Sequence, residues 1–232
     1  MMHNKVWSRV LWVYRREKML GNDRLDFRRA RETLRDHSGL SGNIEEKVTM
    51  KEIDELKSEM DGCRKCTIAK LRHHAVFGEG NLKAPLLFVG EAPGETEDLT
   101  GRPFVGRAGK KLREIFAAIG LKEDDFYITN IIKCRPPNNR NPEPSEISNC
   151  AKYLDAQIKF MGPKVICALG SFAACRMTGS DLPIGKMRGK AFKTDGAAII
   201  PTYHPSFILR NPAMERFLKD DLELVIRTLK GT

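Results

Sequence analysis

The chain has 232 residues, of which 41% are hydrophobic and 30% charged, a composition typical of a globular protein rather than a disordered or membrane-embedded one. No apolar run is long enough to span a bilayer, and basic residues interrupt the apolar N-terminal stretch. We therefore expect no signal peptide and a cytoplasmic location. The 40 Lys and Arg against 30 Asp and Glu give a formal net charge of +10, which favours a polyanionic partner such as nucleic acid.

Residues 1–49 differ from the rest of the chain. They are basic and end in a polar stretch at 37–43 whose glycines and serines are typical of a linker. We predict a division into an N-terminal extension, 1–49, that is poorly ordered or accessory, and a folded domain, 50–232. A DNA-contacting arm is the alternative interpretation of the extension.

The folded domain alternates apolar runs with amphipathic segments. Helical spacing is found at 51–60, 107–119 and 214–229, and further helices are expected at 145–160 and from residue 171. Continuous apolar runs at 85–90, 126–132, 164–170 and 198–202 predict four strands buried on both faces. This alternation predicts a three-layer α/β/α sandwich around a four-stranded parallel sheet. In such sheets the functional residues lie at the carboxyl ends of the strands.

Four of the six cysteines lie in polar or turn-forming sequence and are candidate metal ligands. Cys63 and Cys66 form a C-x2-C pair, Cys134 follows the second predicted strand, and Cys150 lies in the helix after it. The wide spacing of the second pair favours an iron–sulfur cluster, with structural zinc as the alternative. No strand precedes the C-x2-C pair, which argues against a thioredoxin-like redox site.

Three segments leave the ends of predicted strands, at 90–94, 129–130 and 203–206. In the first, Gly90-Glu91-Ala92-Pro93-Gly94, the glycines let backbone amides approach a ligand closely. No Gly-Lys-Ser/Thr follows, so this segment is not a phosphate-binding P-loop. On its own it fits a tight surface loop better than a ligand site.

Four segments in order carry a resemblance to a known family: G-E-A-P-G at 90–94, G-R-P-F-V-G at 101–106, T-N-I-I-K-C-R-P-P-N-N-R at 129–140 and H-P-S-F-I-L-R at 204–210. Together with the four cysteines they resemble the family 4 uracil-DNA glycosylases, over roughly residues 51–230. The resemblance implies a uracil-DNA glycosylase-like fold and removal of uracil from DNA by cleavage of the N-glycosidic bond. It also implies a structural [4Fe–4S] cluster on Cys63, Cys66, Cys134 and Cys150.

The resemblance also implies a site for a uracil base that has been extruded from the DNA stack. Phe104 corresponds to the aromatic residue that stacks on uracil. Asn130 offers an amide that accepts from N3–H and donates to O4, an arrangement that cytosine cannot match. Glu97 resembles the residue that lines the C5 edge and excludes a thymine methyl group, and backbone amides near Ala92 and Gly94 complete base recognition.

His204 and Glu91 are the predicted catalytic residues. His204 is expected beside uracil O2, where a donor stabilises the charge that develops on the departing base. Related glycosylase families place a water-activating Asp directly after the position of Glu91, but here that position holds Ala92. Glu91 is therefore expected to orient the water or the sugar, and the general base stays open.

The last motif also implies contacts with DNA. Leu209 and Arg210 resemble the loop that fills the gap left by the flipped base, and Ser206 is expected to contact a phosphate. Further basic residues are weaker candidates for phosphate contacts: Arg107, Lys110, Lys133, Arg135 and Arg140.

Two other functions compete with the glycosylase interpretation. A related variant forms a covalent adduct with uracil-containing DNA, but its members carry an inserted basic loop and a Gln at the position of Ala92, and this chain has neither. A non-catalytic nucleic-acid-binding protein with a structural metal on the four cysteines is the second competitor. We expect uracil-containing DNA as the partner, a monomer and no membrane contact; the sequence leaves open whether a sliding clamp recruits the protein.

Overall fold

The computed structural model describes residues 48–194 and 196–231, so residues 1–47 of the predicted extension lie outside the described residues. The first described helix, α3 (Met50–Asp61), begins at a capping box. The Thr49 hydroxyl accepts from the Glu52 N–H, and the Glu52 carboxylate accepts from the Thr49 N–H at 2.6 Å. The division of the chain after residue 49 stays a prediction. No helix among the described residues has the length and apolar character needed to cross a membrane.

The four predicted strands form the centre of the sheet, β2 (Leu86–Gly90), β3 (Tyr127–Asn130), β4 (Val165–Leu169) and β6 (Ala198–Thr202), and their pairings are all parallel. Two-residue strands extend it by antiparallel pairing, β1 (Glu79–Gly80) at one edge and β5 (Phe192–Lys193) at the other. The order is β1-β3-β2-β4-β6-β5. The predicted α/β sandwich with its four-stranded parallel sheet is confirmed, and the two edge strands are additions that the sequence did not predict.

Seven helices follow α3 in the described part of the chain: α4 (Glu95–Thr100), α5 (Arg107–Ala118), α6 (Pro144–Met161), α7 (Ser171–Thr178), α8 (Ile184–Met187), α9 (Pro205–Arg210) and α10 (Glu215–Lys230). Helix α6 begins one residue before the predicted start at Ser145. Pro144 fits the first helical position because its missing N–H needs no partner there.

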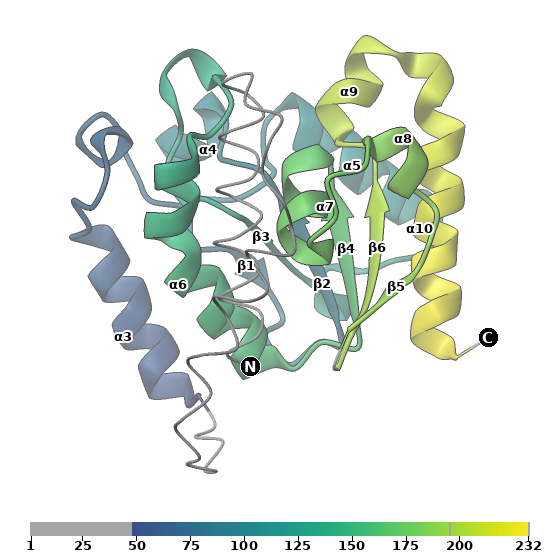
Figure 1. Cartoon of the computed structure of the whole chain (residues 1–232), viewed down its shortest axis with the longest axis horizontal. Helices are drawn as coiled ribbons and strands as arrows, with labels where there is room; N and C mark the ends of the chain where they lie inside the picture. The colour runs from purple at the N-terminus through teal and green to yellow at the C-terminus, as the bar shows by residue number, and fades with distance from the viewer. Residues whose placement is uncertain (1–47, 195, 232) are drawn as a thin grey trace, which may run out of the picture. The chain divides into compact units, whose positions relative to one another are not determined.

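The alternation of side chains along β2 sorts the helices into two layers. Leu86 and Phe88 point to the face covered by α5, α9 and α10, whereas Leu87 and Val89 point to the face covered by α6, α7 and α8. Figure 1 shows the sheet between α6 on one side and α10 on the other. Helix α3 packs outside α6 through a smaller cluster that includes Ile53, Met60 and Tyr153. The carboxyl ends of the four parallel strands therefore share one edge of the sandwich.

Candidate active site

Several of the predicted site residues come together at the carboxyl edge of the parallel sheet. Gly90 ends β2 and is paired with Asn130, which ends β3. His204 lies two residues beyond the end of β6 and is the N-cap of α9. Phe104 reaches the same edge from the loop between α4 and α5. We call the group formed by Gly90, Phe104, Asn130 and His204 the strand-end site.

The absence of a side chain at Gly90 makes the strand-end site possible. A Cβ atom placed on Gly90 would lie 2.5 Å from Oδ1 of Asn130 and 2.5 Å from Cζ of Phe104. Real Cβ atoms do not approach other atoms so closely, so both side chains occupy space that any other residue would fill. Phe104 and Asn130 thus meet directly above the end of β2.

The Asn130 side chain has an unusual hydrogen-bonding state. Only 2% of the residue is exposed, and Oδ1 is buried without a hydrogen-bond partner among the described residues. An unpaired buried acceptor costs about 1–3 kcal/mol, and such groups in native proteins need an explanation. A ligand that donates a hydrogen bond at this position would pair the oxygen.

Phe104 is held in a strained backbone conformation by Glu97. Its φ of 53° lies in the left-handed region, which is unfavourable for a bulky residue. Oε1 of Glu97 accepts from the N–H groups of Val105 at 2.9 Å and Gly106 at 2.7 Å, which fixes the turn directly after Phe104. Oε2 of Glu97 lies 2.8 Å from the place of a Cβ on Gly94. The structure thus places Glu97 as a clamp on the Phe104 loop; its predicted role at the C5 edge stays a prediction.

The imidazole of His204 is neutral and oriented. Its ring centroid is 6.2 Å from that of Phe104, with the planes tilted by 38°. Nδ1 accepts from the backbone N–H of Ser206 at 3.2 Å, so the proton of the neutral ring lies on Nε2. Burial, assisted by the charge of Arg210, lowers the pKa of His204 to about 4. At neutral pH the ring therefore offers one N–H donor.

Glu91 immediately follows β2. Its backbone carbonyl accepts from Ile132 N–H at 3.2 Å, which continues the pairing of β2 and β3 beyond their ends. Burial raises the pKa of the Glu91 carboxyl to about 6, so it is ionised at neutral pH but close to its titration point. Ala92 is half-buried against the core, and Gly94 is the N-cap of α4.

The predicted DNA-contacting residues lie on α9, the helix that His204 caps. Oγ of Ser206 lies 2.8 Å from Nδ1 of His204, so this hydroxyl supports the imidazole. Leu209 is half-buried, and Arg210 is exposed at the end of the helix. The arrangement leaves the guanidinium accessible to a polyanion.

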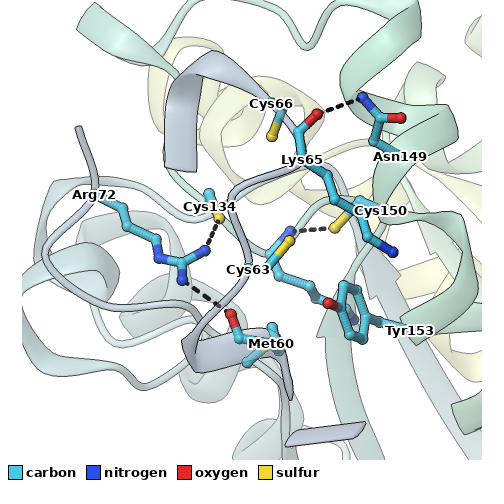
Figure 2. Close-up of a pocket in the computed structure, with 10 residues that line it drawn as sticks. Met60, Cys63, Lys65, Cys66, Arg72, Cys134, Asn149, Cys150 and Tyr153 are labelled. Carbon is cyan, nitrogen blue, oxygen red and sulfur yellow. Dashed lines mark hydrogen bonds between the residues drawn. The ribbon is translucent and has the colours of Figure 1, made fainter. Parts of the chain in front are cut away.

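The four predicted metal ligands line one cavity, shown in Figure 2. Cys63 follows α3, Cys66 begins a 3₁₀ turn (Thr67–Lys70), Cys134 follows β3, and Cys150 lies in α6. The cavity is also lined by six other residues: Met60, Lys65, Arg72, Lys133, Asn149 and Tyr153. Three segments that are separated in the sequence thus converge through their thiols.

Hydrogen-bond donors point at two of the sulfurs. Nη1 of Arg72 donates to Sγ of Cys134 at 3.0 Å, and the backbone N–H of Lys133 donates to Sγ of Cys150 at 3.2 Å. Burial raises the pKa of the Cys150 thiol to about 12, and burial also raises the pKa values of Cys66 and Cys134. Donors of this kind are typical around thiolates that ligate a metal, because they stabilise the sulfur charge.

The donor set fits a metal centre. Four cysteines and no carboxylate line the cavity, a ligand set used both by iron–sulfur clusters and by structural zinc. Within the described residues, no three Cys, His, Asp or Glu side chains are close enough together to hold one metal ion.

Comparison with protein families decides the relationship. The family model described as the uracil DNA glycosylase superfamily matches residues 77–230, which include the whole strand-end site. The chain belongs to this superfamily. The type-4 uracil-DNA glycosylase of Thermotoga maritima is 46% identical over 180 residues, which cover 75% of this chain and 94% of the relative. The type-4 enzyme of Sulfurisphaera tokodaii is 44% identical over 185 residues, 76% of this chain and 84% of the relative.

Similarity to another branch of the superfamily is lower. The type-5 uracil-DNA glycosylase of Pyrobaculum aerophilum is 30% identical over 145 residues, which cover 55% of this chain and 63% of the relative. The predicted resemblance to family 4 is thereby confirmed.

One sequence prediction within this uracil-DNA glycosylase fold is wrong. Lys133 was a candidate phosphate contact, but the structure buries it completely, with no exposed surface. Its Nζ donates within the core to Asn130 O at 3.0 Å and to Gln157 Oε1 at 2.8 Å. The two isoleucines before it and the cysteine after it were the available signal, since a solvated lysine rarely lies in so apolar a run.

A second buried network was not predicted at all. Asp221 of α10 is 1% exposed and accepts from the hydroxyl of Thr202 at the end of β6. Nε of Arg188 also donates to this carboxylate, at 2.9 Å. The network fixes the end of β6 two residues before His204. No local pattern in the sequence links these three residues, because they are separated along the chain and meet only when α10 packs against β6.

Proposed function

We propose that this protein excises uracil from DNA by hydrolysing the N-glycosidic bond of an extruded uridine, with the base seated in the strand-end site. Its membership of the superfamily supports the activity. The observation that carries the placement of the base is the buried, unpaired Oδ1 of Asn130, which lies above Gly90 beside the ring of Phe104. The imide N–H of uracil is a hydrogen-bond donor that would pair this oxygen.

In this proposal Asn130 and Phe104 recognise the base. Oδ1 of Asn130 accepts from uracil N3–H, and its amide nitrogen donates to O4. Cytosine has no proton on N3 and carries an amine in place of O4, so it would leave the oxygen unpaired and set donor against donor. The Phe104 ring supplies a flat apolar face for the base, which offsets part of the unstacking cost of a few kcal/mol.

His204 assists departure of the base. Its Nε2–H is aimed by the bond that Nδ1 accepts from Ser206, and we place it at uracil O2. Negative charge grows on O2 as the glycosidic bond breaks, so this donor binds the transition state more strongly than the substrate. A neutral ring gives up no proton in the process, since its lowered pKa keeps the imidazolium form rare.

Glu91 carries the carboxylate that directly follows β2 at the strand-end site. Ala92 carries no functional group, so no carboxylate at that position can activate water. We place the ionised Glu91 carboxylate at the sugar, where it orients water and stabilises positive charge on the ring. Backbone amides around Ala92 and Gly94 complete the contacts to the base, and Glu97 acts at the C5 edge as well as on the Phe104 loop.

We also propose that Cys63, Cys66, Cys134 and Cys150 hold a [4Fe–4S] cluster with a structural role. When bound, the cluster would fix the segment around Cys63, the loop after Asn130 and helix α6 to one another through iron–sulfur bonds. Iron and acid-labile sulfide analysis of the purified protein tests this. Four irons and four sulfides per chain are expected for this cluster type, together with a brown colour. A colourless protein with stoichiometric zinc would contradict it.

On the DNA side, Ser206, Leu209 and Arg210 are placed at the minor groove and the flanking phosphates. We propose a monomer that acts on chromosomal DNA in the cytoplasm, with a sliding clamp as a candidate partner. Size-exclusion chromatography with light scattering measures the mass of the protein alone, which tests the monomer, and with a clamp added, which tests the partner.

An excision assay tests the activity. Duplex and single-stranded oligonucleotides with one uracil, thymine, cytosine or hypoxanthine are incubated with the protein and then treated with alkali. Strand cleavage at uracil, with none at thymine or cytosine, is expected. A heat-stable protein–DNA band instead would identify the covalent-adduct variant. DNA binding without cleavage or adduct would identify the non-catalytic alternative.

A further inference from the structure

Lys133 lies at the centre of a buried network that touches the strand-end site from behind. Its Nζ lies within hydrogen-bonding distance of four oxygens: the backbone carbonyls of Asn130 at 3.0 Å and Phe77 at 3.2 Å, Oε1 of Gln157 at 2.8 Å, and the hydroxyl of Thr129. Lys133, Thr129 and Gln157 each have no exposed surface. All these acceptors are neutral oxygens, so among the described residues the buried lysine has no carboxylate partner.

Such burial is unfavourable for stability alone. Removing an ammonium group from water costs several kcal/mol even after relaxation, and apolar residues of similar volume often stabilise a core equally well or better. A methionine would fill the same space without this cost. The presence of a lysine at this position therefore needs a reason other than packing.

The Asn130 carbonyl supplies that reason. Strand β1 pairs with β3 only as far as Ile128, so beyond it the β3 edge has lost its neighbouring strand. On the other edge, β2 is in register with Asn130 at Gly90. Nζ of Lys133 takes the place of the missing strand partner and holds the Asn130 peptide plane, from which the amide side chain reaches across Gly90.

The same lysine joins Asn130 to the cysteine cavity. Its backbone N–H donates to Sγ of Cys150, and its backbone carbonyl accepts from Val76 N–H at 2.7 Å. The side chain, the carbonyl and the N–H of Lys133 thus each make a hydrogen bond, and together these bonds connect the end of β3, the segment before β1 and helix α6. Any rotation of the Asn130 peptide would have to break a hydrogen bond in a place that water does not reach.

We propose that Lys133 is a positioning residue for Asn130: by holding the Asn130 carbonyl it fixes the side-chain amide in the orientation that reads uracil. This inference rests on the proposed function. It means that Lys133 contributes to the selectivity for uracil without touching the base. Misplacement of a reacting or recognising group by about 1 Å can cost about a hundredfold in rate, so the loss of this bond should be measurable.

A double-mutant cycle tests the proposal. Single-turnover excision of uracil is measured for the parent, Lys133→Met, Asn130→Ala and the double variant. We expect Lys133→Met to slow excision by about tenfold to a hundredfold in the parent. In the Asn130→Ala background it should cost less than about twofold, because no amide is left to position. Inhibition by free uracil gives a second readout: Lys133→Met should weaken it by a factor similar to the loss in rate.

Tyr127→Phe is the matched control. The Tyr127 hydroxyl is buried in the same network, where it accepts from Nε2 of Gln157 at 3.3 Å, but it touches neither Lys133 nor Asn130. This variant should change the rate by less than about twofold and by the same factor in both backgrounds. Melting temperature and visible absorbance are recorded for every variant.

The outcomes separate the inference from the proposed function. A parent protein that does not release uracil would remove both. A parent that is active, with Lys133→Met equally costly in both backgrounds, would overturn only the positioning role. If Lys133→Met does not fold, Lys133→Leu is used in the same cycle, since it also lacks a donor to the Asn130 carbonyl. Failure of both to fold would show that the lysine serves the core itself, and would also overturn the inference.

Discussion

The strand-end site and the cysteine cavity both collect side chains from distant segments, but they leave opposite kinds of polar group unpaired. In the strand-end site the buried, unpaired atom is an acceptor, Oδ1 of Asn130. In the cysteine cavity it is the hydroxyl of Tyr153, which can donate and lies close to Cys63 (Figure 2). An unpaired acceptor suits a neutral ligand with an N–H group, whereas an unpaired donor among sulfurs suits an anionic, sulfur-rich group. This difference supports the proposal of a transiently bound base in the first site and a resident cofactor in the second.

The largest expected effect comes from matching changes to an amide in each region. Asn130→Asp removes the donor to O4 and adds a buried charge, so we expect single-turnover uracil excision to fall by about a thousandfold or more. Asn149→Asp is the control: it is an exposed amide of the cysteine cavity, where Nδ2 donates to Lys65 O at 2.9 Å. Its excision rate should stay within about twofold of the parent. Equal losses in the two variants would contradict the assignment of base recognition to Asn130.

His204→Ala should be the next most costly change. Removal of one donor aimed at a developing anion typically lowers the rate by about a hundredfold to a thousandfold. Binding of uracil-containing DNA should change little, because the proposed bond strengthens only in the transition state. Fluorescence anisotropy with a labelled duplex measures binding, and rapid-quench assays measure excision. A variant that excises uracil at the parent's rate would remove His204 from the mechanism.

The pH profile gives a smaller and more specific effect. Burial raises the pKa of Glu91 to about 6, and burial also lowers the pKa of His204 to about 4. From mildly acidic to neutral pH, His204 thus stays neutral while Glu91 loses its proton. If the carboxylate is the active form, the excision rate should rise with pH, reach half its maximum near pH 6 and then level off.

Glu91→Gln supplies the control for that profile. It should be slower than the parent at neutral pH and should lack the rise near pH 6, since the amide does not titrate. A parental rate that falls with increasing pH through this range would mean that protonated Glu91 is the active form.

The contrast between the two regions also explains how far the sequence could be read. The four central strands were predictable because each is an apolar run buried on both faces, and the parallel topology then places their ends at one edge. The two-residue edge strands have no pattern of their own, since their conformation depends on the neighbouring strand. Phe104 entered only through the resemblance to known glycosylases, because its left-handed backbone depends on Glu97, seven residues earlier. Lys133 was misassigned because a sequence shows the charge of a lysine but not the carbonyls that gather around it.

Tyr153→Phe should have the smallest effect on excision and therefore sharpens the comparison most. The change deletes only a buried hydroxyl, whose pKa is raised by burial and by the neighbouring Cys63. Because the residue lies in the cysteine cavity and not in the strand-end site, the excision rate should stay within about twofold of the parent.

The same substitution should change the properties of the proposed cluster. We expect the Tyr153 hydroxyl to donate to a ligating sulfur when the cluster is bound, which stabilises the more negative, reduced state. Without this donor the reduction potential should fall, and visible absorbance should be lost faster under a chelator. Voltammetry and chelator-challenge kinetics measure these effects. Lys51→Met serves as a surface control, because the exposed Lys51 pairs with Glu55 along α3 and does not line the cavity. If Tyr153→Phe slowed excision but left the cluster unchanged, the unpaired hydroxyl would take part in substrate binding. The assignment of separate roles to the strand-end site and the cysteine cavity would then be wrong.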